Sequence, residues 1–587
     1  MRRTKIVATL GPASNEVDII KKLINAGINA ARFNFSHGDY EEHGQRIRNL
    51  KQAREELNAP IPIILDTKGP EIRTRDVEGG SVELVKGEKF TITTDDIVGD
   101  STKVAVTYKD MPNDLNIGST ILIDDGLIEL TVLEINGTNI VCRIENSGTL
   151  GCKKGVNLPN VHVNLPALTE KDKEDIKFGI KMGIDYIAAS FIRTARDVLE
   201  IRKVLEENDG LGISIIAKIE SRDGVDNIDE ILEVSNAIMV ARGDLGVEIP
   251  LEEVPIVQKH LIQKAREKGK TVITATQMLE SMTHSPRPTR AEANDVANAI
   301  FDFTDAIMLS GESAKGDYPV QAVETMVKIA NKIEANIDYV EQFNRNNAVA
   351  MTSITNAISH SACTTAHDLN AACIGAVTMT GTAIKKIAKY RPANIILGCT
   401  PVDRTLRQLN LVWGVKPVKV GMEQHHFVTL FDAVAEKAIE TGLCSVGDTM
   451  VFVGGTPLGK TGTTNTLKVG IVGNVILEGK IKSGSKSESV TASTKVIKTA
   501  EEAEIHFEKG EILVTDRTDD ELVDYMKKAS AIIVGSGGHD DFSTAINVGK
   551  ELGIPVLTSK KNVTEIVPNA IVVTLDTQHG IVLNKSH

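Results

Sequence analysis

Eight short apolar segments, separated by stretches with helical periodicity, set the strongest limit on how this chain can fold. They span residues 5–10, 30–33, 62–65, 186–189, 214–219, 237–240, 271–275 and 306–309. Strands that alternate with helices favour parallel βα units, and eight such units can close into a barrel. Each segment ends in polar or charged residues, and (β/α)8 barrels carry their active sites at the carboxyl ends of the strands. The order of elements therefore predicts an α/β fold, a (β/α)8 (TIM) barrel with an active site at that face.

Three further regions depart from the barrel pattern. One alternates polar and apolar residues with hairpin signals at 125–126 and 136–137, which predicts a small β-barrel lid. A second α/β region follows the barrel, and a polar linker at 479–487 precedes a final small α/β domain. The expected domains are the barrel (1–69 and 171–335), the lid (70–170), an α/β effector-binding domain (336–473) and an extra C-terminal domain (474–587).

Charge and cysteine usage exclude several classes of protein. The net charge is −13 over 587 residues, which argues against a nucleic-acid partner and against binding to a membrane surface. The six cysteines show neither close pairing nor metal-ligand spacing, which is typical of reduced thiols. We find no signal-peptide core and no apolar run long enough to span a bilayer, so we expect a cytoplasmic protein.

Charged residues at the ends of two apolar strands are the most informative detail. Lys218 and Glu220 share one face of the fifth strand, and Asp244 follows the sixth. Buried charges are rare unless they are paired or bind a metal. The three residues thus indicate a site for a hard cation that handles an anion, although a buried ion pair of the carboxylates with Lys218 or Arg242 is an alternative from geometry alone.

Seven motifs, in order along the chain, resemble the pyruvate kinase family over residues 1 to about 473. They are ARFNFSHG (31–38), LDTKGPEIR (65–73), KKGVNLP (153–159), IAKIES (216–221), ARGDLG (241–246), ATQMLE (275–280) and LSGESA (309–314). Any one of them is weak by itself, but seven on matching elements leave little room for chance. The extra C-terminal domain suggests the bacterial type.

The resemblance implies transfer of a phosphoryl group from phosphoenolpyruvate to ADP, which gives ATP and pyruvate in the last step of glycolysis. It implies Mg²⁺ (or Mn²⁺) held by Glu220 and Asp244, with a second Mg²⁺ on the nucleotide. Lys218 would face the phosphoryl group in flight, and Arg32 would hold the substrate phosphate. The catalytic and substrate-binding residues implied are Arg32, Lys218, Gly243, Asp244 and Thr276.

Thr276 would lie on the face of the enolate that receives a proton. A hydroxyl is a poor acid, so a water relay through Thr276, touching Ser310 and Glu312, is the more plausible route. Without the resemblance, Thr276 is equally interpreted as the cap of the following helix.

A monovalent cation and a nucleotide complete the implied site. The resemblance assigns K⁺ to Asn34, Ser36, Asp66 and Thr67, the last through its carbonyl oxygen; from sequence alone, hydrogen bonds within turns explain these residues equally well. Glu71 is the residue found in K⁺-dependent members. The nucleotide contacts implied are Asn34, His37, Arg73 and Lys154.

The second α/β region carries an expected regulatory site. Thr380, Thr382 and Lys385 match the place where the family holds a phosphorylated allosteric effector. We expect the glycine-rich loop at 454–463 to help seat a phosphate-bearing ligand there. An ordinary helix start with capping threonines is the alternative. The resemblance also implies a homotetramer.

The C-terminal domain resembles the swivelling phosphohistidine domain of phosphoenolpyruvate-using enzymes. Ser543 stands where that family has its phosphorylated histidine, and His539 lies upstream in a glycine-rich loop. We therefore expect no phosphocarrier activity.

Two other functions fit parts of the sequence. A metal-dependent aldolase or lyase acting on pyruvate enolate also uses a carboxylate pair, but does not explain the lid lysines 153–154 or the K⁺-type cluster. A non-catalytic binder of sugar phosphates would use only the region of Thr380, and does not explain Lys218 with its two carboxylates.

Overall fold

The computed structural model describes residues 1–345, 353–421, 427–455, 464–473, 475–484, 489–536 and 541–584. The chain divides into two compact units, and each is described by itself. The first comprises residues 1–363, 376–422 and 454–466, and the second comprises residues 364–375, 423–453 and 467–587.

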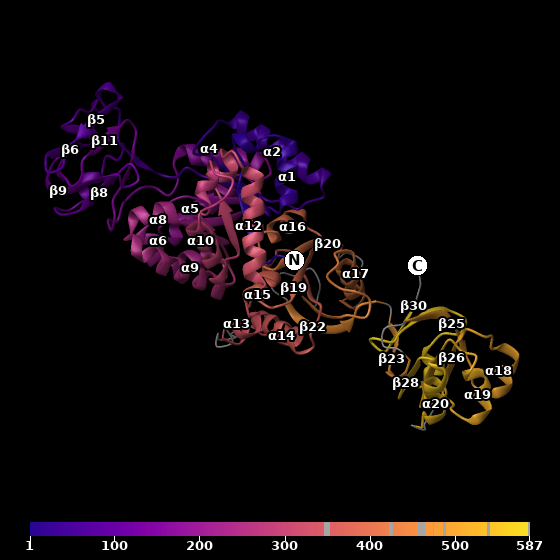
Figure 1. Cartoon of the computed structure of the whole chain (residues 1–587). Helices are drawn as coiled ribbons and strands as arrows, with labels where there is room; N and C mark the ends of the chain where they lie inside the picture. The colour runs from indigo at the N-terminus through magenta and orange to yellow at the C-terminus, as the bar shows by residue number, and fades with distance from the viewer. Residues whose placement is uncertain are drawn as a thin grey trace. The chain divides into compact units, whose positions relative to one another are not determined.

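Eight parallel strands close into the predicted barrel (Figure 1). Around the barrel their order is β1-β17-β16-β15-β14-β13-β3-β2. The strands are β1 (Lys5–Thr9), β2 (Ala30–Asn34), β3 (Ile63–Asp66), β13 (Tyr186–Ala189), β14 (Ser214–Ile219), β15 (Ala237–Ala241), β16 (Thr271–Ala275) and β17 (Ala306–Leu309). The prediction of a (β/α)8 barrel is confirmed, with each expected strand within about a residue of its observed position.

Helices cover the outside of the barrel. The covering helices are α1 (Val17–Ala26), α2 (Tyr40–Glu56), α4 (Glu170–Lys181), α5 (Ala195–Glu207), α7 (Ile228–Val234), α9 (Val254–Lys268), α10 (Arg290–Phe301) and α12 (Pro319–Glu334). Short helices follow three strands: α6 (Arg222–Asp226), α8 (Arg242–Glu248) and α11 (Gly311–Ala314). Capping boxes at Thr169 and Thr289 fix where α4 and α10 begin. Apolar side chains fill the layer between strands and helices, and this layer is the largest core of the molecule.

The lid has its own sheets and its own core. A seven-stranded sheet runs in the order β4-β12-β8-β9-β10-β6-β7, and β11 pairs with β5. Its elements are β4 (Ile72–Arg73), β5 (Ser81–Leu84), β6 (Lys89–Thr93), β7 (Lys103–Ala105), α3 (Met111–Asp114), β8 (Thr120–Ile123), β9 (Ile128–Asn136), β10 (Asn139–Ile144), β11 (Gly148–Gly151) and β12 (Gly155–Asn157). Hairpins join β8 to β9 and β9 to β10 at the two sequence signals, where Gly126 and Gly137 have positive φ.

Strands and helices alternate again after the barrel. They are α13 (Tyr339–Arg345), α14 (Ile354–Asp368), β18 (Cys373–Val377), α15 (Thr382–Ala388), β19 (Ile395–Thr400), α16 (Asp403–Leu409), β20 (Val415–Lys419), α17 (Phe427–Glu440), β21 (Thr449–Gly455) and β22 (Thr464–Ile471). Within the first unit β19 and β20 pair in parallel.

Residues 391–413 attach to the base of the barrel through two buried carboxylates. Arg391 forms an ion pair of 3.0 Å with Asp305, which lies just before β17, and Arg407 forms one of 2.8 Å with Asp185, just before β13. Leu411 is fully buried among the side chains inside the barrel. The amino-terminal end of the barrel is therefore closed by this segment.

The second unit contains an eight-stranded sheet in the order β23-β30-β29-β25-β26-β27-β28-β24. Its elements are β23 (Val475–Glu478), β24 (Lys480–Ser483), β25 (Val490–Val496), α18 (Ala500–His506), β26 (Ile512–Thr515), α19 (Val523–Met526), β27 (Ala531–Gly535), α20 (Ser543–Leu552), β28 (Val556–Ser559), α21 (Val563–Ile566), β29 (Val572–Asp576) and β30 (Ile581–Asn584). Two apolar clusters stabilise it.

The predicted linker at 479–487 was wrong in its first half, because Lys480–Ser483 form strand β24 and pair with β28. Only Ile481 is apolar here, and it packs against the domain core between two lysines. β24 is an edge strand, and edge strands often carry lysines that prevent further pairing. Its sequence is therefore as polar as that of a linker.

Among the described residues, no helix has the length and apolar character needed to cross a bilayer.

We predict that Asp305→Ala destabilises the first unit by about 3–5 kcal/mol, because it leaves the buried Arg391 guanidinium without its counterion. Asp305 also accepts hydrogen bonds from the backbone N–H groups of Val272 and Trp413. The measurement is urea unfolding followed by tryptophan fluorescence, since Trp413 is the single tryptophan and lies beside this pair. The double variant Asp305→Ala/Arg391→Met should lose less than the single variant; an equal or larger loss would contradict the assignment.

Candidate active site

Lys218, near the end of β14, lies at the centre of a buried polar cluster. Its Nζ atom lies 2.8 Å from Glu220 Oε1 and 3.2 Å from Asp66 Oδ1, and it donates a hydrogen bond of 2.7 Å to Ser190 Oγ. Lys218 is 8% exposed and the two carboxylates are about 1% exposed. Burial opposes the charged ammonium, but Asp66 and Glu220 outweigh it and raise the pKa of Lys218. Lys218 is therefore a permanent positive charge in a dry site.

Glu220 and Asp244 come from adjacent strands. Ile219 lies opposite Val240 in the pairing of β14 with β15, which brings the two strand ends together. Burial raises the pKa of Glu220, Lys218 lowers it and the nearby Asp244 raises it further. Burial is also the largest cause of the raised pKa of Asp244. The Glu220 carboxylate is buried and the Asp244 side chain is exposed. Two neighbouring carboxylates of which one disfavours the charge of the other form a donor set that suits a divalent cation.

Glu220 and Asp244 are not part of a larger cluster of metal-ligating side chains in the described part of the chain. No group of three or more His, Cys, Asp or Glu side chains that could hold a metal occurs in the described part of the chain. Mg²⁺ is usually bound through one or two carboxylates, with water and substrate oxygens in the other positions, so the pair has the donor number that Mg²⁺ requires.

Arg32 reaches the cluster from β2. Its Nε atom forms an ion pair of 2.6 Å with Asp66 Oδ2, and its Nη1 atom donates to Thr9 Oγ1 at 3.0 Å. Burial disfavours the charged form of Asp66, but Arg32 and Lys218 outweigh it and lower the pKa of Asp66. One carboxylate thus holds two cationic side chains at the carboxyl ends of the strands.

The four residues predicted to bind K⁺ lie on two adjacent strand ends. Asn34 stands opposite Asp66 in the pairing of β2 with β3. Asn34 Oδ1 accepts a hydrogen bond of 3.2 Å from the Ser36 N–H, and the Thr67 carbonyl accepts one of 2.7 Å from Ser190. The structure brings the four residues together, with Asp66 already paired to Arg32 and Lys218.

Thr276 follows β16 in an uncommon backbone conformation, with φ of 65°. Its Oγ1 atom accepts a hydrogen bond of 2.8 Å from the Gly243 N–H, and its carbonyl accepts one of 2.7 Å from Arg242. Arg242 is in turn held by Asp295 at 2.6 Å. Left-handed backbone in a β-branched residue costs free energy and is typical of functional sites. Thr276 is therefore tied to Arg242 and Gly243 at the start of α8.

Glu312 links the two loops that follow β16 and β17. It is fully buried and accepts hydrogen bonds from the backbone N–H groups of Leu279 and Ser310 at 3.0 and 2.7 Å. Burial raises the pKa of Glu312. The Ser310 hydroxyl is buried and has no hydrogen-bond partner among the described residues, so it is available to bind water or substrate.

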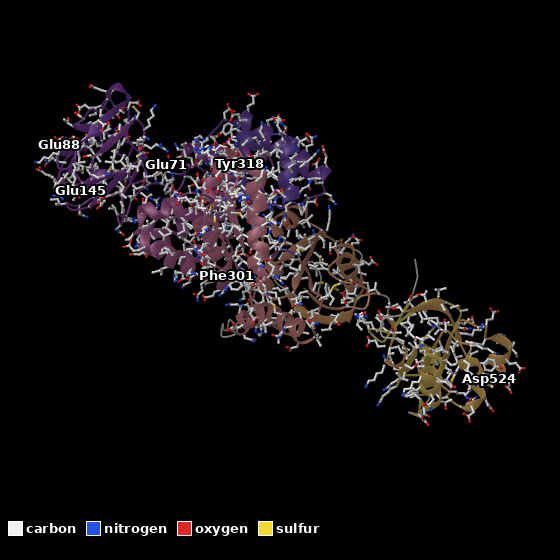
Figure 2. All side chains as sticks on the ribbon, viewed as in Figure 1. Glu71, Glu88, Glu145, Phe301, Tyr318 and Asp524 are labelled. Atoms are coloured by element: carbon white, nitrogen blue, oxygen red, sulfur yellow. The ribbon has the colours of Figure 1, made fainter. Side chains whose placement is uncertain are left out.

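A cavity of about 500 Å³ separates the lid from the carboxyl ends of the barrel strands. Its lining includes Arg73 and Lys154 from the lid and Asp244 from the barrel. Arg73 is oriented by Glu71 at 2.6 Å, where the chain passes from the barrel into the lid (Figure 2), and Lys154 forms an ion pair of 2.8 Å with Asp124. The predicted nucleotide residues Arg73 and Lys154 thus share one cavity; His37 is not part of its lining.

Family models match almost the whole chain. The pyruvate kinase barrel domain matches residues 1–323, the pyruvate kinase alpha/beta domain matches 356–470, and the mobile domain of PEP-utilising enzymes matches 507–580. The chain belongs to the pyruvate kinase family. It is a phosphotransferase of the bacterial type with the extra C-terminal domain.

The individual relatives that match this chain are also pyruvate kinases. The chain is 48% identical to pyruvate kinases of Bacillus licheniformis (99% of each chain covered) and Geobacillus stearothermophilus (99% and 98%). A crystal structure of a pyruvate kinase from Cryptosporidium parvum is 41% identical and superposes with a TM-score of 0.77, covering 80% of this chain and 96% of that one. That structure leaves about a fifth of the present chain unmatched.

The predicted effector residues of this pyruvate kinase do not form one cluster. Thr380 and Thr382 lie with their hydroxyl oxygens 3.0 Å apart, beside Gly381, whose φ is 83°. Lys385 instead lines a small cavity with Asp305 and Lys270 from the barrel base, and burial followed by Lys270 lowers the pKa of Lys385 to about 8. Most of the loop at 454–463 lies outside the described residues.

Ser543 begins helix α20, and its N–H donates to Asp541 at 2.9 Å. Ser543, the position at which we expect the phosphorylated histidine of the mobile-domain family, is therefore an ordinary helix start. His539 lies outside the described residues.

Sequence analysis missed three groups of contacts. Ser190 and Phe191 touch Lys218 and Glu220, and only the polar ending of the fourth strand pointed to them. The lid also contacts the barrel through Asn157, which donates to Glu248 at 2.7 Å, and His162, which bonds to Asp223 at 2.7 Å. Nothing in their spacing signals these contacts, because the partners lie about 60 to 90 residues apart.

We predict that Gly69→Ala lowers pyruvate kinase turnover at least about tenfold, since a shift of about 1 Å at a site can cost up to about a hundredfold. Gly69 has φ of 75°, and a Cβ there would lie 2.7 Å from Ser190 Cβ, pushing on the corner that contacts Lys218. Gly79→Ala is the matched control, because Gly79 has φ of 65° but no atom within 4 Å of the added Cβ. Turnover and thermal unfolding of both variants are compared; equal effects would mean that backbone strain alone matters at Gly69.

Proposed function

We propose that this chain transfers the phosphoryl group of phosphoenolpyruvate to ADP, giving ATP and pyruvate, as the last step of glycolysis. The observation that carries the proposal is the buried ammonium of Lys218 between Asp66 and Glu220, at the strand ends where Glu220 and Asp244 meet. Phosphoryl transfer depends on positioning and on stabilising charge over the equatorial oxygens, and an ammonium on a rigid strand supplies both. The family and its relatives support the same reaction.

Glu220 and Asp244 would hold Mg²⁺ or Mn²⁺, and a second Mg²⁺ would accompany the nucleotide. The fit rests on the buried Glu220 and the more exposed Asp244, two carboxyl groups whose pKa values are both raised. A divalent cation between them would lower both pKa values. Bound there, the ion would orient the substrate and stabilise the enolate charge. The Phe191 N–H donates to Glu220 at 2.6 Å and holds one carboxylate oxygen, as second-layer hydrogen bonds do for ligating carboxylates.

Lys218 and Arg32 bind and orient the phosphoryl group. Arg32 is fixed by Asp66 and Thr9, so its guanidinium needs little reorganisation on binding the substrate phosphate. Lys218 faces the transferring group from the adjacent strand. Gly243 and Asp244 follow on the next loop, where the Gly243 N–H orients Thr276.

The enolate is protonated from the side of Thr276. The Thr276 hydroxyl donates to the Ala275 carbonyl at 2.7 Å, so it orients a water rather than giving up its own proton. The unpartnered Ser310 hydroxyl and the Glu312 carboxyl complete the relay.

K⁺ is proposed to bind Asn34, Ser36, Asp66 and the Thr67 carbonyl. Glu71, the residue found in K⁺-dependent members of the family, supports a requirement for K⁺. The nucleotide would contact Asn34, His37, Arg73 and Lys154, of which the two lid residues line the cavity. Closure of the lid would exclude water.

Membership of the family supports a proposal on regulation and assembly. We propose that a phosphorylated metabolite binds near Thr380 and Thr382, and that the enzyme is a homotetramer. Lys385 is not part of this proposal, because it lines the cavity at the barrel base. The six cysteines, all of which lie in the described residues, form no disulfide, which suits the cytoplasm. The domain boundaries proposed from sequence are retained: 1–69 with 171–335, 70–170, 336–473 and 474–587.

We predict that Lys218→Met lowers ATP formation at least about a thousandfold, because transition-state charge loses its fixed cation. A coupled assay with phosphoenolpyruvate and ADP measures it, and the exposed Lys203→Met is the control. Near-normal ATP formation by folded Lys218→Met would refute the role. Pyruvate release without ADP would instead favour a lyase.

Removing either metal carboxylate should weaken Mn²⁺ binding by about a hundredfold, in line with the large cost of losing one of few ligands. Glu220→Gln and Asp244→Asn are titrated with Mn²⁺ by electron paramagnetic resonance in the absence of substrate. Glu312→Gln serves as the control. Glu312 is as buried as Glu220, but among the described residues it accepts hydrogen bonds only from backbone N–H groups. Unchanged affinity in both ligand variants would exclude this metal site.

A further inference from the structure

The Ser190 hydroxyl lies between two groups of the proposed site. Lys218 Nζ donates to Ser190 Oγ at 2.7 Å, and Ser190 Oγ donates to the Thr67 carbonyl at 2.7 Å. Ser190 is 3% exposed, so water does not compete for these bonds. A hydroxyl has one proton and two lone pairs. Because the proton is used on Thr67, a lone pair must face Lys218, and the direction of the ammonium is fixed.

The backbone holds this hydroxyl in place. The Ser190 N–H donates to Thr67 Oγ1 at 3.2 Å, so two bonds tie Ser190 to the end of β3. Phe191 has φ of 55°, which is rare for a bulky residue, and its N–H donates to Glu220 at 2.6 Å. Gly69 packs directly against the corner. Strained backbone persists only where its surroundings over-determine it, and here its contacts end on Glu220 and Lys218.

Ser190 also fixes the position of the Lys218 ammonium between two carboxylates. Asp66 and Glu220 both attract Lys218, and a flexible four-carbon side chain could move toward either carboxylate. An ammonium has three N–H donors, and Asp66, Glu220 and Ser190 supply three acceptors. The neutral third acceptor therefore defines one position between two charged partners.

We propose that Ser190 is a positioning residue for phosphoryl transfer, and that it couples Lys218 to the Thr67 strand end where a monovalent cation binds. This inference rests on the proposed function. It gives a role to Ser190, to which the family resemblance assigned none. A cation at the Thr67 carbonyl shares that oxygen with the Ser190 hydroxyl. The strength of the Ser190 bond, and with it the placement of Lys218, therefore depends on the cation.

Ser190→Ala tests the proposal in the full-length enzyme. We expect kcat to fall by about 10- to 100-fold, the cost of displacing a reacting group by about 1 Å, with the KM for phosphoenolpyruvate changed by less than about threefold. The half-saturating K⁺ concentration should rise about threefold or more, because the Thr67 carbonyl loses its hydrogen-bond partner. A purely structural serine would lower thermal stability without moving the K⁺ dependence.

Two further variants keep the result clear. Ser235→Ala is the matched control, since Ser235 is 1% exposed and lies far from the strand ends that carry the site, after α7. Ser190→Cys keeps a side chain of the same shape, slightly larger and with a weaker donor and acceptor, so its kcat should lie between wild type and Ser190→Ala. It also provides the test if Ser190→Ala does not fold.

The outcomes separate this inference from the proposed function. If the wild-type enzyme forms ATP but folded Ser190→Ala, or Ser190→Cys in its place, keeps kcat and K⁺ dependence within about twofold of wild type, the positioning role is overturned. If wild type forms no ATP from phosphoenolpyruvate and ADP, the proposed function itself fails.

Discussion

The contact on which the site depends is the buried ammonium of Lys218 balanced between Asp66 and Glu220. Burying an isolated charge is costly, so this lysine is tolerated only because carboxylates from two other strand positions surround it. Asp66 also holds Arg32, which makes one carboxylate responsible for two cationic groups. A closed sheet makes this possible, because parallel strands deliver all of these side chains to one edge.

Around that balance, the neighbouring loops place partners with little freedom. Gly243 and Arg242 fix Thr276, Glu312 fixes the loops after β16 and β17, and Phe191 fixes Glu220. Most of these bonds involve backbone groups, which lose little entropy when a substrate binds. Such an arrangement is suited to stabilising charge that develops only during the reaction.

The sequence predicted the barrel and the positions of Lys218, Glu220 and Asp244, because period, burial and polar strand ends are local properties. The pairing of Asn34 with Asp66 needed only the order of strands. The contact of Ser190 with Lys218 and the lid contact of Asn157 could not be predicted, since they depend on distances between loops that are remote in sequence. Strand β24 was missed because an edge strand with two lysines has the composition of a linker.

Leu411 has a consequence for how the molecule is built. It lies fully buried among the residues that fill the inside of the barrel, although it belongs to a segment beyond the eight strands. A fragment ending at the last barrel helix would leave an apolar hole at the amino-terminal face and unpaired charges at Asp185 and Asp305. The catalytic barrel is therefore not self-sufficient. We expect its folding to be completed only after the ribosome has synthesised the 77 residues that run from the end of α12 at Glu334 to Leu411.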